Sequence, residues 1–107
     1  MQESFSNNEI GTIRVKFIGV LKGLAKQEEL SIQVSTEEIS LIELFKLIIQ
    51  LINNNEFAKR VFNSTLTQIS PDVMVSYEDK IISARGNEKM KIKKGSILTV
   101  FSFVHGG

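Results

Sequence analysis

The stretch Ser40–Ile52, SLIELFKLIIQLI, predicts the central helix of the fold. Ser40 is followed three residues later by Glu43, a spacing typical of a capping box, in which both side chains accept hydrogen bonds from backbone N–H groups at a helix start. Apolar residues recur at helical spacing, and one stripe collects Leu41, Leu44, Phe45, Ile48, Leu51 and Ile52. Further apolar residues lie beside this stripe and leave only a narrow polar face. We therefore expect a helix that packs on a sheet and on one more neighbour, and that is ended by Asn53–Asn55.

Two segments before this helix alternate between apolar and polar residues, as half-buried strands do. They are TIRVKFIGV, residues 12–20, and ELSIQVS, residues 29–35. The link between them is short and contains Gly19 and Gly23. We therefore expect a hairpin whose two strands are joined by a glycine-containing turn.

The segments after the helix predict a second helix and three strands. EFAKRVF (56–62) carries apolar residues at helical spacing, VMVSY (73–77) and KIIS (80–83) read as short strands, and SILTVFSF (96–103) reads as a long last strand. This order favours an α+β domain, in which one main helix and a short second helix pack on a mixed sheet. A right-handed crossover predicts that the chain passes from the second strand, through the helix, to a parallel strand beside the first.

The composition predicts one globular, cytoplasmic domain. The chain has 107 residues, of which 42% are hydrophobic and 23% charged, and its formal net charge is +1. A charge so near neutral argues against direct nucleic-acid binding. The absence of cysteine excludes disulfides, cysteine metal sites and cysteine nucleophiles. The N-terminal MQESFSNNEI lacks the features of a signal peptide, and no apolar run is long enough to cross a membrane.

The side chains predict neither an active site nor a metal site. The single histidine, His105, lies near the end of the chain, where no third group would orient it as a catalytic base, so we expect His105→Ala to have only a modest effect. Asp72 and Asp79 flank the third strand, and the adjacent glutamates at strand and helix ends are typical of solvated positions. The lysines Lys89, Lys91, Lys93 and Lys94 favour a charged strand edge that resists edge pairing, with attraction to an acidic enzyme surface or acceptance of a conjugate as the functional alternatives.

The last residues, FSFVHGG (101–107), predict the functional end of the protein. We expect a flexible arm over residues 1–10, a domain over residues 11–101 and a mobile tail over residues 102–107. Two glycines without Cβ atoms suit a peptide that threads a narrow channel, and an extended tail from Ser102 to Gly107 spans roughly 20 Å. The carboxylate of Gly107, next to Gly106, is therefore the expected reactive group.

Alternation along the last strand places Leu98 and Val100 towards the helix, and Ile97, Thr99, Phe101 and Phe103 on the opposite face. An aromatic on an open face beside a functional tail indicates a binding patch. We therefore expect Phe101, Phe103, Val104 and His105 to contact a partner protein. The alternative is that Phe101 covers the sheet edge as ordinary core.

From Thr12 to Gly107 the chain resembles the ubiquitin-like sulfur carriers, a family that includes the ubiquitin-related modifier, the small subunit of molybdopterin synthase and the thiamine carrier ThiS. IRVKFIGVLKGLA resembles the first strand and turn of the family, SLIELFKLI its first helix, and KIKKGSILTVFSFVHGG its last strand and tail. The ending VHGG is most similar to the ubiquitin-related modifier. The molybdopterin subunit usually has two prolines before its tail, where this chain has Phe101-Ser102-Phe103, and Gly95-Ser96 stands where the family often has Gly-Asp.

This resemblance implies a ubiquitin-like β-grasp fold and a function as a co-substrate rather than an enzyme. An E1-like activating enzyme would use ATP to adenylate Gly107, and a persulfide or rhodanese-type donor would convert the adenylate to a thiocarboxylate. The sulfur would pass to a tRNA-thiolating enzyme, or the activated end would be joined to protein lysines. No cofactor would be bound to the chain itself. The alternatives are a small subunit of molybdopterin synthase and a plain β-grasp binding module.

Overall fold

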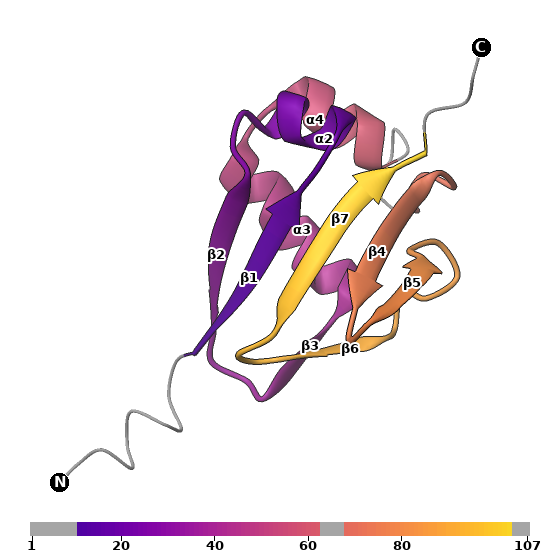
Figure 1. Cartoon of the computed structure of the whole chain (residues 1–107). Helices are drawn as coiled ribbons and strands as arrows, with labels where there is room; N and C mark the ends of the chain where they lie inside the picture. The colour runs from indigo at the N-terminus through magenta and orange to yellow at the C-terminus, as the bar shows by residue number, and fades with distance from the viewer. Residues whose placement is uncertain (1–10, 63–67, 104–107) are drawn as a thin grey trace, which may run out of the picture.

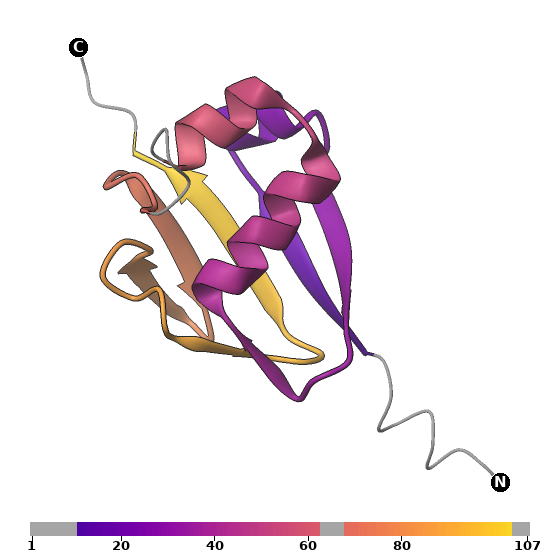
Figure 2. The same ribbon diagram turned by 180° about the vertical axis from the view of Figure 1, so that it is seen from behind.

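The computed structural model describes residues 11–62 and 68–103 and forms a mixed five-stranded sheet with helices on one face (Figure 1). Seen from behind, α3 crosses the sheet and α4 lies beyond its C-terminal end (Figure 2). The strand order is β2-β1-β7-β4-β5, and β3 and β6 make a separate two-stranded sheet. The elements are β1 Gly11–Phe17, α2 Val20–Ala25, β2 Glu29–Val34, β3 Glu38–Ser40, α3 Leu41–Ile52, α4 Asn55–Val61, β4 Val73–Tyr77, β5 Lys80–Ser83, β6 Lys91–Lys93 and β7 Ile97–Ser102. This architecture confirms the predicted β-grasp fold with one main helix and a short second helix.

The centre of the sheet is the pairing of its first and last strands. β1 is antiparallel to β2 and parallel to β7, while β4 is antiparallel to both β7 and β5. The predicted parallel strand beside the first strand is confirmed, and it is β7, the last strand of the order. The long connection through α4 carries the chain past the central position, and β7 fills it with Leu98 and Val100, which are both fully buried.

The central helix α3 begins and ends where its sequence predicts. The Ser40 hydroxyl accepts a hydrogen bond from the Glu43 N–H at 3.3 Å, and Asn53 closes the helix in the left-handed conformation with φ of 52°. The apolar stripe is buried against the sheet at Leu41, Leu44, Phe45 and Ile48. Leu51 was wrongly assigned to this buried stripe, because it lies in the last turn and is 54% exposed.

The link between the first two strands is a short helix rather than the predicted plain turn. The pairing of β1 with β2 is confirmed, but residues Val20–Ala25 form α2 between them. Leu21 and Ala25 of this helix are buried, and α2 packs on β7 and α4. Burial of these two apolar side chains explains why the link forms a helical turn despite Gly23.

The two-stranded sheet of β3 and β6 carries part of the lysine cluster. Lys91 and Lys93 are exposed on β6, whose middle residue Ile92 is buried and pairs with Ile39. Lys94 follows the strand and forms a 3.6 Å ion pair with Glu37. β6 pairs with β3 on one side only, so it is an edge strand of this two-stranded sheet, as the strand-edge interpretation of these lysines requires.

The predicted second helix is α4, and its start is set by an asparagine. The Asn54 side chain accepts a hydrogen bond from the Phe57 N–H at 3.0 Å, so Asn53 ends one helix and Asn54 caps the next. Phe57 and Val61 are buried. The Phe57 ring meets that of Phe17 edge to face, with 5.6 Å between ring centroids. These contacts anchor α4 to the core.

Candidate functional site at the end of β7

The two faces of β7 divide as the alternation predicts. Leu98 and Val100 point to the helices and are fully buried, whereas Ile97 is 44% exposed on the outer face. Phe101 lies on this outer face, half-buried, and is paired across the strands with Met74 of β4. The predicted alternation of β7, with Leu98 and Val100 towards the helices and Ile97 and Phe101 on the outer face, is therefore confirmed.

The end of β7 leads directly to the predicted reactive residues. The strand runs to Ser102, which pairs with Val73. Phe103 follows it and is 54% exposed. Val104, His105, Gly106 and Gly107 lie outside the described residues, as does the arm predicted over residues 1–10, so their predicted roles and the predicted domain division stay predictions.

A cluster of polar contacts surrounds the end of this strand. The Arg60 guanidinium, from the last turn of α4, donates to the Asp72 carboxylate through Nη1 at 2.5 Å. Its other terminal nitrogen, Nη2, donates to the Ser102 hydroxyl at 3.2 Å and to the Phe103 carbonyl at 3.3 Å. The Phe103 N–H donates to the Asp72 carbonyl at 2.8 Å. One arginine thus joins α4, the residue before β4 and the end of β7.

An open groove lies next to this cluster. It is lined by Lys59, Arg60, Ser70, Pro71, Asp72 and Phe103. Phe103 therefore borders α4 and the approach to β4, while Phe101 lies over the sheet beside Met74. The structure places the two aromatic residues of the predicted patch in different surroundings.

The sequence did not single out Arg60 or its contact with Ser102. Forty-two positions separate these two residues, and no periodicity links them. The available signals were local ones. Arg60 stands beside Val61 in the last turn of a short amphipathic helix, and Asp72 follows Pro71 immediately before a strand. Only the packing of α4 on the sheet brings them together.

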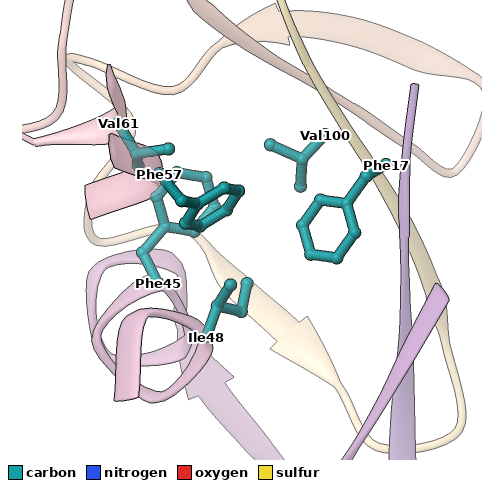
Figure 3. A pocket seen from close by; sticks show the side chains of 6 residues that line it. All are labelled: Phe17, Phe45, Ile48, Phe57, Val61 and Val100. Carbon is teal, nitrogen blue, oxygen red and sulfur yellow. The ribbon is translucent and has the colours of Figure 1, made fainter. Parts of the chain in front are cut away.

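The described interior offers no room for a small molecule. The gap between Phe17, Phe45, Ile48, Phe57, Val61 and Val100 is lined only by apolar side chains and is too narrow for water (Figure 3). It is packed core between the helices and the sheet. Across residues 11–62 and 68–103, no group of three or more His, Cys, Asp or Glu side chains could hold a metal ion. In the same ranges, no helix has the length and apolar character needed to cross a bilayer.

On the outer face of the sheet, an ion pair joins β1 and β2, at the opposite edge of the sheet from β4. The Arg14 Nε donates to the Glu29 carboxylate at 2.7 Å. This hydrogen bond lowers the pKa of Glu29 and raises the pKa of Arg14. Both side chains are exposed, so the pair is screened by solvent and contributes little to folding.

A β-grasp sheet whose last strand is central and ends at the surface defines a ubiquitin-like protein. The fold matches SAMP1 from Haloferax volcanii with a TM-score of 0.72 and 15% identity, over 91% of this chain and 100% of that one. It matches Urm1 from Trypanosoma brucei with a TM-score of 0.69 and 23% identity, over 92% and 97% of the two chains. A putative molybdopterin converting factor, subunit 1, from Pyrococcus furiosus matches with a TM-score of 0.63 and 20% identity, over 88% and 99%.

The family follows from the sequence match. Residues 12–107 match the family model of Urm1, the ubiquitin related modifier. No curated protein matches the sequence significantly. The chain belongs to the Urm1 family of ubiquitin-like modifiers, which confirms the resemblance to the ubiquitin-like sulfur carriers.

Proposed function

We propose that the chain is a sulfur carrier and protein modifier that is activated at the Gly107 carboxylate. The observation that carries this proposal is the family match, which extends to residue 107 and so includes Gly106 and Gly107. The central place of β7 gives the proposal a structural basis, because this strand connects the core directly to the residues before the diglycine.

The first step would be adenylation by an E1-like enzyme. A carboxylate oxygen of Gly107 attacks the α-phosphorus of ATP, and pyrophosphate leaves. A carboxylate is a poor electrophile, whereas the resulting mixed anhydride carries AMP as a good leaving group. The chain supplies the substrate for this step, and the activating enzyme supplies the catalytic groups. It is in this sense a co-substrate that needs no cofactor of its own.

The second step would transfer sulfur or join the chain to a protein. A donor persulfide attacks the carbonyl carbon and displaces AMP, and a partner thiol then cleaves the S–S bond to leave a thiocarboxylate and a disulfide on the donor. The thiocarboxylate gives its sulfur to a tRNA uridine through a thiolating enzyme. In the alternative branch, a lysine amine attacks the activated carbonyl and forms an amide. We place both branches in the cytoplasm.

The surface at the end of β7 is the proposed contact for the activating enzyme. Phe103 is exposed, and Phe101 lies half-buried on the outer face of the sheet. Exposed aromatic side chains are frequent anchors in protein interfaces. Val104 and His105 complete this proposed contact on the way to the glycines.

Intact-mass spectrometry of the protein isolated from its own cells tests the proposal. Replacement of one carboxyl oxygen of Gly107 by sulfur is the expected result, together with lysine adducts if the chain is also conjugated. A chain that carries neither and co-purifies with a large molybdopterin synthase subunit would instead identify a small subunit of that enzyme. A chain with neither modification nor such a partner would be a plain β-grasp binding module.

A further inference from the structure

The last described residue, Phe103, is held at both of its backbone polar groups although it lies past the end of β7. Its N–H donates to the Asp72 carbonyl at 2.8 Å, and its carbonyl accepts from Arg60 Nη2 at 3.3 Å. A residue just past a strand end commonly frays, but the antiparallel register of β4 and β7 places Phe103 opposite Asp72. Here two side-chain and main-chain contacts continue the order by one residue.

Arg60 can hold Phe103 because the Arg60 side chain is itself fixed by its helix α4, by Asp72 and by Ser102. The helix that carries it is anchored by buried Phe57 and Val61. Its guanidinium is paired with Asp72, and the two side chains are only 30% and 16% exposed. Partial burial reduces the screening of this pair by salt. The planar fork of arginine then directs a second nitrogen to Ser102 and Phe103.

We propose that Arg60 is a positioning residue that sets the point and direction from which the C-terminal residues reach the activating enzyme. This inference rests on the proposed function. Gly107 lies four positions after Phe103, a stretch that spans roughly 14 Å when fully extended. The position of Phe103 therefore limits the positions that the Gly107 carboxylate can reach. If Phe103 were free, the enzyme would have to order it, together with its neighbour, at each encounter.

Loss of the Arg60 contacts is expected to weaken binding to the activating enzyme without changing the rate of the adenylation step. Ordering the backbone of one residue lowers an affinity by roughly 5–30-fold. Loss of the Arg60 contacts leaves the hydrogen bond from the Phe103 N–H to Asp72 in place, so it should raise the KM for the chain by up to about that factor. The contacts of Arg60 lie at Asp72, Ser102 and Phe103 and not at the Gly107 carboxylate, so kcat should stay within about two-fold.

The test variant is Arg60→Lys. Lysine keeps the positive charge beside Asp72 but lacks the planar fork that reaches Ser102 and Phe103 at the same time. Arg85→Lys is the matched control, because Arg85 also holds a backbone carbonyl, that of Ile69 at 2.9 Å, in the segment before β4. Both variants should keep the cooperative thermal unfolding of the parent chain.

The measurement is ATP–pyrophosphate exchange with the E1-like enzyme that adenylates the parent chain, combined with hydrogen exchange of the Phe103 amide by NMR. Arg60→Lys should raise KM, leave kcat nearly unchanged and speed amide exchange at Phe103, while Arg85→Lys changes none of these. Ser102→Ala should have a smaller effect alone and add nothing to Arg60→Lys, because its contact runs through the same guanidinium.

Three results would overturn the inference. A KM for Arg60→Lys within two-fold of the parent value would show that the contacts do not matter for activation. A raised KM with unchanged Phe103 exchange would mean that the enzyme reads the Arg60 side chain directly. An equal rise for Arg85→Lys would indicate a general effect of loosened structure. A parent chain that no E1-like enzyme adenylates would overturn the proposed function as well, whereas these three results leave it standing.

Discussion

The two faces of β7 differ in what surrounds them. On the inner face, Leu98 and Val100 lie fully buried between the sheet and the helices. On the outer face, Ile97 is 44% exposed and Phe101 is half-buried, and the described helices all lie on the other side of the sheet. A single strand thus separates residues that hold the domain together from residues that a partner can reach. In this chain, stability and recognition should therefore respond to different substitutions of neighbouring residues.

The largest expected effect belongs to neither face. Deletion of Gly107, or of Gly106 and Gly107, should abolish ATP–pyrophosphate exchange with the activating enzyme, because the attacking carboxylate would be displaced. Thermal unfolding should not change, since the core of the described domain ends with β7. Normal exchange by the shortened chain would contradict the proposed site of activation.

The inner face should give the next largest effect. Leu98→Ala removes a fully buried side chain and is expected to lower the free energy of unfolding by about 2–5 kcal/mol. Ile97→Ala, one position away on the outer face, is the matched control and should cost much less. Denaturant unfolding measures both. An equal loss of unfolding free energy in the two variants would contradict the difference in burial between the two faces of β7.

The aromatic residues should affect binding more than folding. Phe103→Ala is expected to weaken binding to the activating enzyme by about 1–3 kcal/mol with little change in melting temperature. Phe101→Ala should weaken binding similarly, with a larger loss of stability because its ring is half-buried. Titration calorimetry and thermal unfolding together separate the two effects. If Phe101→Ala unfolds the domain yet spares binding per folded molecule, Phe101 belongs to the core.

The smallest effect is expected from the charged pair on the outer face. Its hydrogen bond with Arg14 lowers the pKa of Glu29 in the folded state. The stabilisation is therefore fully present above the pKa of the unfolded chain and is lost as the pH falls through the lower folded value. Glu29→Gln should unfold slightly earlier than the parent chain at neutral pH. The two melting temperatures should converge in acid, and a difference that grows in acid would contradict this assignment.

The sequence was sufficient for the fold where the pattern was long or had a local cap. The alternation of β1 and β7 and the capped stripe of α3 each contain enough residues to define a period. The α2 helix was missed because its six residues include Gly23 and show only two buried positions. The three-residue strands β3 and β6 are too short to alternate visibly. A parallel partner of β1 was expected, but its identity as β7 was not, because local patterns carry no information about which later strand takes the central place.

The candidate site was predictable in one part only. The diglycine and the phase of Phe101 follow from the chain itself, because both depend on neighbouring residues. The contacts of Arg60 with Asp72 and Ser102 depend on how α4 packs on the sheet, over 12 and 42 positions of sequence. No periodic pattern encodes such a contact.

The pairing of the first strand with the last also constrains when the protein can acquire its structure. During translation, β1 emerges early but has only β2 beside it until β7 has left the ribosome. The core cannot close before that point, because Leu98 and Val100 are part of it. The order of synthesis therefore couples the completed fold to the presence of the strand that leads to the diglycine. A prematurely terminated chain would lack its central strand and should be recognised as unfolded by cellular proteases before it could compete for the activating enzyme.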